Sequence, residues 1–247
     1  MPRLKQLFLL VCMCVMTVPA NASETALPRP FTATYSLHSM GTRFANMTRR
    51  FSRDEDGKYR YRSETKTAGL FAMIRKDHIV EESVWHVDSG QIKPLHYSYI
   101  HTGGKKNRDV IINFDWAGRN ITNTVNGSSW HMPIQAYIMD KLLYQLAIMH
   151  DLENGQESVS YTIADGGKIK TYDFKLIRRE TVETPMGQFD ALVLERHKPG
   201  SERKTTIWCA VELGYMPVKV DNIENSGRRT MAVIETLTND PSPGPDI

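Results

Sequence analysis

The sequence predicts a mostly β fold: a curved antiparallel sheet or an incomplete β-barrel with one substantial helix. Three observations support this prediction. Apolar and polar residues alternate through many short segments, as they do in strands that place one face in a core. Glycine-containing turn pairs separate these segments, as expected for tight antiparallel connections. One segment in the middle of the chain instead has the apolar spacing of a helix.

The strands are predicted from residue parity. Phe31, Ala33, Tyr35 and Leu37 share one face of a first strand, and the same alternation recurs over residues 59–63 and 79–85. The predicted turns between the strands are Asp56-Gly57, Ser89-Gly90, Gly103-Gly104, Asn126-Gly127, Asp165-Gly166-Gly167 and Met186-Gly187.

One helix is predicted near residues 134–152, where apolar side chains recur at helical spacing and Asn154-Gly155 provides a stop signal. Its wide apolar face suits a helix that lies on a curved sheet. A shorter helical turn is predicted around residues 68–73. The apolar positions that define the long helix are Ile134, Ile138, Leu142, Leu146 and Met149.

Two stretches, EESVWHVDSGQIKPLHYSYI and TTIWCAVELGYMPVKVDN, share an order of residues, and Trp85 to Pro94 has the same separation as Trp208 to Pro217. Each stretch reads as strand, turn and strand. The proline stands at the start of the second strand, where a missing backbone donor is tolerated. We therefore predict that both tryptophans are buried packing residues rather than parts of a surface site.

The chain ends point to export. Residues 1–22 carry two basic residues, an apolar run over 7–18 and the cleavage pattern Ala20-Asn21-Ala22, which together predict a signal peptide and a periplasmic protein. The apolar run is too short to span a bilayer, so no transmembrane segment is expected. Residues 23–30 and 239–247 are predicted to be flexible, which leaves a single β-rich domain over 31–238.

The charge argues against binding of nucleic acid, and the cysteine content excludes an intramolecular disulfide. The formal net charge of the chain is +3, and removal of Arg3 and Lys5 with the signal peptide lowers it to +1. Such a balance gives no bulk attraction to nucleic acid. Loss of the signal peptide also removes two of the three cysteines and leaves Cys209 alone, so an intramolecular disulfide is excluded.

The segments ETPMGQFDALVLE and TTIWCAVELGYMPVKV resemble the secreted bacterial family catalogued as domain of unknown function 3108. The segments KTAGLFAMIRKDHIVEESVW, IKPLHYSYI and MDKLLYQLAIM agree, so the resemblance covers roughly residues 31–237. The family looks like a curved antiparallel sheet or incomplete barrel, similar to periplasmic lipoprotein carriers that hold acyl chains in an apolar concavity. This resemblance implies a fold and does not fix a function.

The sequence contains none of the specific catalytic or metal-binding signatures, such as H-E-x-x-H, G-x-S-x-G, a Walker loop or paired C-x-x-C. His96 and His101 point to opposite faces of an extended strand and so form no metal pair. An inward-facing Glu81, on the strand face of Trp85, would be a candidate acid, although a solvated or ion-paired glutamate is commoner. We expect no cofactor, no metal and, on balance, no catalysis.

The sequence-based hypothesis is a periplasmic protein that binds a lipid-like or amphiphilic envelope ligand. Acyl groups would contact Ile138, Leu142 and Met149 on the helix. Basic pairs along the chain would form a rim that meets lipid or glycolipid headgroups. One alternative is a protein that binds or modifies envelope polysaccharide, with Trp116 and Trp130 as sugar platforms. The other alternative is an interaction scaffold of the cell envelope.

Overall fold

The computed structural model describes residues 27–105, 107–197 and 200–239. Fifteen strands form one continuous sheet in the order β8-β7-β6-β5-β4-β3-β2-β1-β15-β14-β13-β12-β11-β10-β9. The strands are β1 (Phe31–Ser39), β2 (Thr42–Arg53), β3 (Tyr59–Thr67), β4 (His78–Asp88), β5 (Gln91–Thr102), β6 (Arg108–Asp115), β7 (Asn120–Val125), β8 (Ser128–Pro133), β9 (Ile138–Asp140), β10 (Ser158–Asp165), β11 (Lys168–Thr184), β12 (Gly187–His197), β13 (Lys204–Ala210), β14 (Met216–Ile223) and β15 (Arg229–Asn239).

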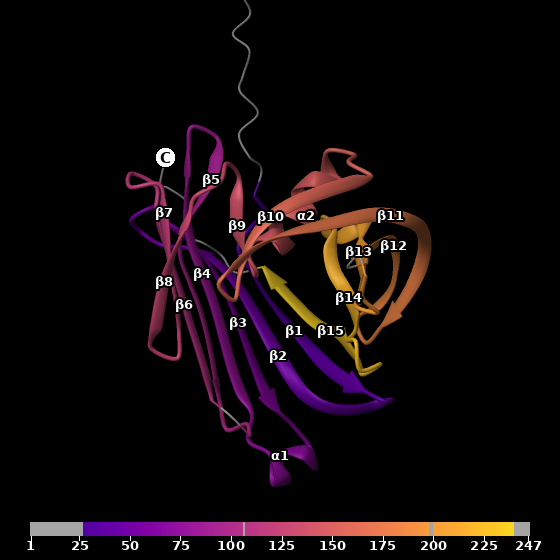
Figure 1. Ribbon diagram of the computed structural model, residues 1–247. Helices are drawn as coiled ribbons and strands as arrows, with labels where there is room; N and C mark the ends of the chain where they lie inside the picture. The colour runs from indigo at the N-terminus through magenta and orange to yellow at the C-terminus, as the bar shows by residue number, and fades with distance from the viewer. Residues whose placement is uncertain (1–26, 106, 198–199, 240–247) are drawn as a thin grey trace, which may run out of the picture.

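The sheet consists of two meanders that the ends of the chain join. Strands β1 to β8 and β10 to β15 each run as successive antiparallel neighbours, and residues 31–38 of β1 pair with residues 231–239 of β15. The short strand β9 pairs in parallel with β10. Figure 1 shows β1 to β8 as one long wall and β10 to β14 as the opposing wall. The sheet is not closed by backbone pairing, because β8 and β9 are its edges, and the predicted curved, mostly antiparallel fold is confirmed.

Side chains close the seam that the backbone leaves open. Strand β9 packs against β5, and the carboxylate of Asp140 on β9 accepts a hydrogen bond from Ser83 Oγ on β4. At the other edge, Trp130 Nε1 on β8 donates to the carbonyl oxygen of Gly167, in the turn between β10 and β11, at 3.1 Å. The barrel is therefore held shut by side-chain contacts.

The substantial helix begins later than the sequence predicts. Helix α2 covers Tyr144–Glu153, so three of the five residues assigned above to the helix lie before it. Ile138 belongs to strand β9, and Ile134 and Leu142 also precede the helix. The carboxylate of Asp140 accepts hydrogen bonds from the backbone N–H groups of Leu142 and Leu143 at 2.8 and 2.9 Å, so the turn that leads into α2 starts only after β9. Tertiary pairing with β10 outweighs the helical periodicity.

Two smaller helical segments complete the fold. Helix α1 (Phe71–Ile74) overlaps the helical turn predicted around residues 68–73, beginning three residues later and ending one residue later. A 3₁₀ turn, η1 (Val211–Leu213), joins β13 to β14. Among the described residues, neither α-helix has the length and apolar character needed to cross a bilayer.

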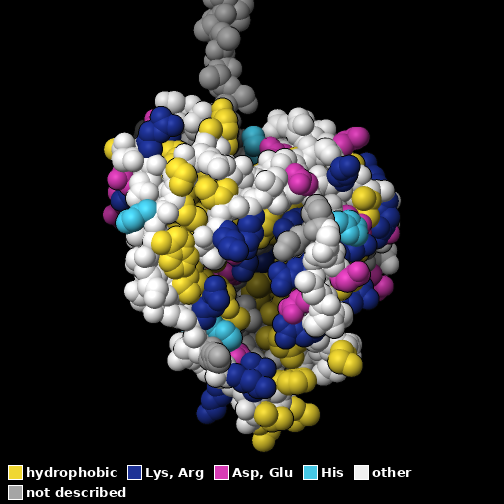
Figure 2. Space-filling view, in the orientation of Figure 1, with side chains coloured by type: hydrophobic (Ala, Val, Ile, Leu, Met, Phe, Trp, Pro, Cys, Tyr) yellow, Lys and Arg dark blue, Asp and Glu magenta, His cyan; other side chains and the backbone are white. Residues whose placement is uncertain are grey.

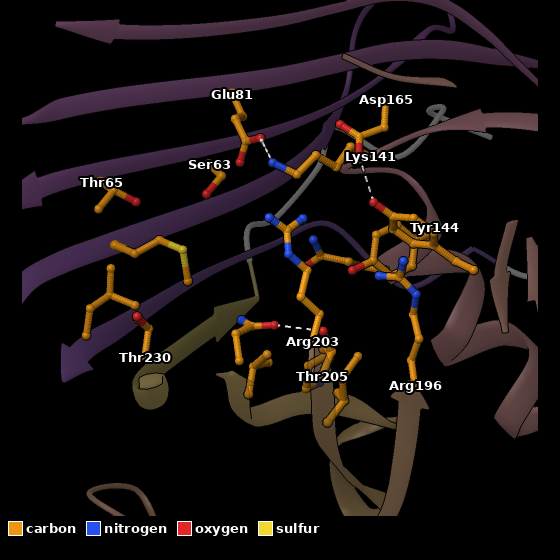
Figure 3. Close-up of a pocket in the computed structure, with 18 of the residues that line it drawn as sticks. Ser63, Thr65, Glu81, Lys141, Tyr144, Asp165, Arg196, Arg203, Thr205 and Thr230 are labelled. Atoms are coloured by element: carbon orange, nitrogen blue, oxygen red, sulfur yellow. Dashed lines mark hydrogen bonds and ion pairs between the residues drawn. The ribbon is translucent and has the colours of Figure 1, made fainter. Parts of the chain in front are cut away.

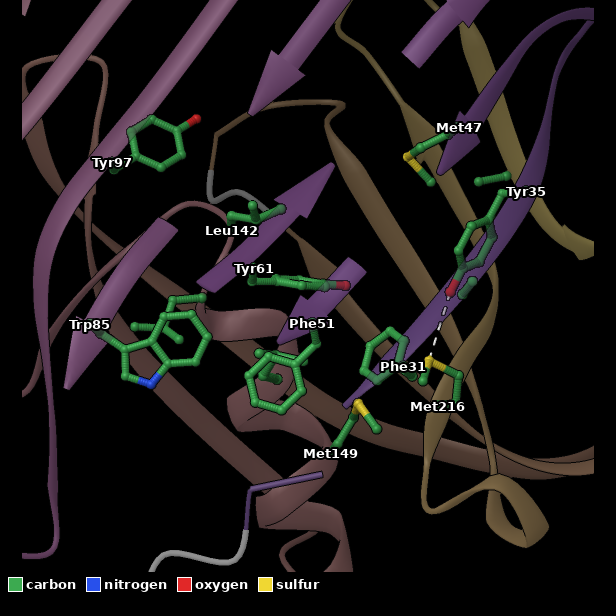
Figure 4. Packing of buried hydrophobic residues seen from close by; sticks show 14 of the residues in the cluster. Phe31, Tyr35, Met47, Phe51, Tyr61, Trp85, Tyr97, Leu142, Met149 and Met216 are labelled. Carbon is green, nitrogen blue, oxygen red and sulfur yellow. Dashed lines mark hydrogen bonds between the residues drawn. The ribbon is translucent and has the colours of Figure 1, made fainter. Parts of the chain in front are cut away.

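The core lies between the walls and contains both predicted tryptophans. Figure 4 shows Trp85 among its neighbours there. The side chain of Trp85 is fully buried and that of Trp208 is 7% exposed, which confirms the prediction. One β-bulge lies between Val84 and Trp85, and Trp85 pairs with Pro94. Another bulge lies between Trp208 and Cys209. The shared spacing therefore marks two bulged hairpins of one scaffold.

The predicted signal peptide, residues 1–22, lies outside the described residues. So do residues 23–26 and 240–247, whereas Asn239, assigned above to the flexible tail, is the last residue of β15. Cys209 is buried on β13.

Candidate functional site

A cavity of about 940 Å³ opens between the two walls, and Figure 2 shows the hollow on the face of the molecule drawn there. Strands β1 to β5 line one side of it. Strands β10 to β15 and the segment from Lys141 into α2 line the other side. The α2 face that meets the cavity carries Tyr144, Gln145 and Ile148.

Part of the lining is apolar. The apolar side chains that line the cavity come from both walls, so the apolar part of a ligand would contact side chains on two sides. They are Leu37, Phe44, Met47, Ile79, Ile148, Ile207, Pro217, Val220 and Ile223.

Arg49 on β2 brings a positive charge into this lining. It shares the inward face of its strand with Met47 and Phe51, and its residue surface is 9% exposed. Its guanidinium lies over the ring of Tyr35, 5.4 Å from the centroid, and its Nε has no hydrogen-bond partner. No carboxylate of the described residues forms an ion pair with Arg49. Burial alone would lower the pKa of Arg49, but the nearby Tyr61, Tyr35 and Glu81 raise it above its ordinary value. The guanidinium is therefore a buried charge without a direct ion pair among these residues.

A second charged group stands in the turn between β9 and α2. Lys141 Nζ lies 3.5 Å from Glu81 Oε1, and Tyr97 donates its hydroxyl to the same carboxylate at 2.8 Å. The attraction of Glu81 raises the pKa of Lys141 above its ordinary value and outweighs the opposing effect of burial. Lys141 and Glu81 are therefore paired with each other within the protein.

The opposing wall carries an ion pair between Lys170 and Asp165 and a guanidinium that stacks on a tyrosine ring. Asp165 accepts hydrogen bonds from Lys170 Nζ at 2.6 Å and from the Tyr172 hydroxyl at 2.9 Å. Burial alone would raise the pKa of Asp165, but the Lys170 hydrogen bond and the charges of both lysines lower it below its ordinary value. The guanidinium of Arg196 lies 3.4 Å from the centroid of the Tyr172 ring.

The cavity carries an excess of positive charge. Arg203 extends into it from the position just before β13, and Figure 3 shows Lys141, Arg196 and Arg203 directed into one space. Five basic side chains line the cavity against three carboxylates, those of Glu81, Asp165 and Glu224. In the part of the chain that the structure describes, Arg49, Arg196 and Arg203 form no ion pair with a carboxylate. The arrangement can bind an anion, and an apolar wall lies beside it.

The residues predicted from the sequence lie elsewhere. Ile138 and Leu142 are fully buried in the core, and Met149 lines a second hollow of about 400 Å³ near Leu27 and Phe31. That these three residues contact a ligand stays a prediction. The lining of the large cavity includes none of them.

The two candidate sugar platforms are partly buried. Trp116 Nε1 donates to the carbonyl oxygen of Pro94 at 2.7 Å, and Trp130 Nε1 is bonded to Gly167. Both indoles therefore have structural contacts within the protein, and a role in sugar binding stays a prediction.

Other sequence candidates find ordinary partners. His96 Nδ1 lies 2.8 Å from the Asn113 side-chain oxygen, whereas His101 Nε2 lies 2.9 Å from Asp77 Oδ1. The described residues hold no cluster of three or more His, Cys, Asp or Glu side chains placed to bind a metal. Glu81 does face the interior on the side of Trp85, where Lys141 and Tyr97 contact it.

One solved structure shares the fold at very low identity, and a second matches more weakly. A β-barrel-like protein of the domain of unknown function DUF1849 from Brucella abortus matches with a TM-score of 0.55 and 8% identity, over 86% of this chain and 98% of the other. A protein from Bacteroides fragilis described as exported, with a YmcC-like fold, matches with a TM-score of 0.34 and 9% identity, over 86% and 97% of the two chains. The first match shows similarity of fold alone.

No curated protein matches the sequence. A family described as "Protein of unknown function (DUF3108)" matches residues 31–233, which covers most of the chain and every strand from β1 into β15. The chain therefore belongs to the DUF3108 family.

Proposed function

We propose that this protein is a non-enzymatic, periplasmic binding protein whose cavity takes an amphiphilic anion, a molecule with an apolar body and an acidic group. The observation that carries the proposal is the buried guanidinium of Arg49, which has no carboxylate partner and stands beside an apolar wall. The Nε of this guanidinium has no hydrogen-bond partner among the described residues. A buried donor of a charged group is costly when it is left unpaired, so we expect it to serve a bound counter-ion.

The lining supports this ligand class in two ways. Arg203 and Arg196 add guanidinium donors that suit carboxylate or phosphate oxygens. A volume of about 940 Å³ lies within the range of small-molecule and cofactor sites. Lipid-like envelope components combine these features, and the signal-peptide pattern of residues 1–22 supports the periplasmic location.

A displacement assay with a fluorescent fatty acid tests the proposal. We expect saturable binding of the fatty acid and much weaker binding of its methyl ester, which lacks the charge. Replacing Arg49 by methionine should weaken fatty-acid binding roughly ten- to hundredfold, the value of a hydrogen bond to a charged group. Lys175→Met, on an exposed position of β11 outside the cavity, is the matched control and should bind as wild type does.

Absence of saturable binding, or equal binding of the acid and its ester by wild type and Arg49→Met, would overturn the proposal. Intact mass spectrometry of protein purified gently from its own envelope identifies the natural ligand. A retained glycan would favour the polysaccharide alternative, and the absence of any retained molecule together with a negative displacement assay would favour the scaffold alternative.

A further inference from the structure

Helix α1 and the residue that precedes it expose a group of large apolar side chains. Leu70, Met73 and Ile74 are 79%, 83% and 82% exposed, and Phe71 is 41% exposed. We call these four residues the apolar tip. Figure 2 shows hydrophobic side chains gathered at the lower end of the molecule, where Figure 1 places α1. Adjacent exposed apolar side chains of this size mark an interaction surface.

The apolar tip stands on a well-anchored loop. Thr67 Oγ1 donates to the Arg75 carbonyl oxygen at 2.8 Å, and Thr67 N donates to the Asp77 carbonyl oxygen at 3.1 Å, so the two ends of the loop are tied together. The ring of Phe71 packs edge-on against Phe44, with centroids 6.5 Å apart. The backbone is therefore fixed, and the side chains of Leu70, Met73 and Ile74 still face outward.

Basic side chains surround the apolar tip. Lys66 and Arg75 flank it and are paired with Glu64 and Asp77, respectively. Lys76 follows directly and is exposed. The turn between β5 and β6, which carries the exposed Lys105, packs against it so closely that a Cβ on Gly103 would lie 1.9 Å from the Lys76 carbonyl oxygen. Four cations and two carboxylates leave this end of the molecule positive.

We propose that the apolar tip inserts into the surface of an anionic phospholipid bilayer, with the surrounding cations on the headgroups. Apolar side chains with flanking Lys and Arg are the composition of interfacial membrane anchors. A stable protein partner or a second copy needs about 800 Å² on each side, which four side chains on one helical turn do not offer. The bilayer needs no such area, because each inserted side chain adds its own transfer free energy.

This proposal is independent of the ligand proposal, although the two sites are neighbours. Phe44 lines the cavity and also contacts Phe71 of the apolar tip. Insertion of the tip would therefore bring the β2 wall of the cavity to the membrane surface.

Vesicle flotation with the protein purified from the envelope of expressing cells tests the proposal. We expect it to float with vesicles of phosphatidylglycerol and phosphatidylethanolamine and to float weakly with phosphatidylcholine alone. The triple variant Leu70→Ser, Met73→Ser, Ile74→Ser should lose most binding, at about tenfold for each side chain removed. The control is Tyr137→Ser, Ile177→Ser, which removes exposed apolar groups elsewhere and should float like wild type.

A second pair of substitutions tests the cations. Lys76→Gln with Lys105→Gln should weaken binding to the anionic vesicles about fivefold per charge and leave binding to phosphatidylcholine unchanged. The replaced groups are exposed, so circular dichroism and melting should match wild type. Equal flotation of wild type and the triple variant would overturn the proposal. So would a dimer in analytical ultracentrifugation that the triple variant abolishes while wild type fails to float.

Discussion

The indole of Trp85 lies almost parallel to the ring of Phe51 on β2, with centroids 5.7 Å apart and planes tilted by 6°. Tyr59 stacks on the same indole at 5.7 Å. Removal of Trp85 therefore leaves a large void within an aromatic stack. We expect Trp85→Ala to lower the free energy of unfolding by about 3–5 kcal/mol, measured by urea denaturation. Trp116→Ala, at a partly buried indole, should cost less, and equal losses for the two variants would contradict this account.

Asp140 gives the protein a specific dependence on pH. Burial raises the pKa of Asp140 to about 6 from 3.8, although hydrogen bonds from Ser83, Leu143 and Leu142 oppose the rise. Between these two values the folded protein keeps a proton that the unfolded chain has released. The contribution of Asp140 to the free energy of unfolding is therefore fully present at low pH. It is lost as the pH rises through about 6, and the total loss is about 3 kcal/mol.

The variant Asp140→Asn isolates this effect. Its carbonyl oxygen can still accept the hydrogen bonds of Leu142 and Leu143, and the side chain no longer titrates. We expect its stability relative to wild type to increase by about 3 kcal/mol between roughly pH 4 and pH 7, measured by denaturant unfolding across that range. A constant difference across the range would show that Asp140 is ionised throughout.

Substitution of Gly167 tests whether Trp130 packs across the seam between the two sheet edges. A Cβ at this position would lie 1.8 Å from Trp130 Cζ2, and its φ is +81°. Gly127 has a similar φ of +84° with nothing within 4 Å of such a Cβ. We expect Gly127→Ala to cost about 1 kcal/mol from backbone strain alone, and Gly167→Ala to cost about 1–3 kcal/mol more. Thermal melting compares the two, and equal costs would mean that Trp130 does not pack on that turn.

Arg49 should cost the empty protein stability. Within the described part of the chain its buried charge forms no ion pair and its Nε has no hydrogen-bond partner, although Tyr61, Tyr35 and the more distant Glu81 favour the charged form. Arg49→Met exchanges this ion for an apolar side chain of similar length. We expect the free energy of unfolding of ligand-free protein to rise by about 1 kcal/mol or more. Urea denaturation of delipidated protein measures this, with Lys175→Met as the neutral control. A loss of stability would show that the stacking on Tyr35 outweighs the cost of burying the charge.

The fold could be predicted because its signals are local. Residues 31–37 alternate because one side of β1 packs in the core, and the Asn126-Gly127 pair takes positive φ at both residues, as the tight β7–β8 hairpin requires. Both tryptophans were predicted as core residues from their place in strand, turn and strand. Each of these inferences needs only a few neighbouring residues.

The cavity depends on contacts between distant strands, and periodicity does not show these. Ile138 fits a helical pattern but pairs with Thr162 on β10, a contact that no short window contains. The basic pair Arg49-Arg50 suggests a solvated rim, yet Arg49 shares strand parity with the buried Met47 and Phe51. Strand parity is therefore the sequence signal that identifies Arg49 as the arginine of the pair that faces the cavity.

The pairing of β1 with β15 also sets an order in time. As the chain emerges from its N-terminus, each hairpin of β1 to β8 can form once its second strand is made, because its contacts are local. The free edge of β1 finds its partner only when residues 229–239 have emerged. An unpaired edge is a template for association with other chains. Strand β1 is thus the first to be made and the last to be protected, and a chain truncated before residue 229 would leave its edge exposed.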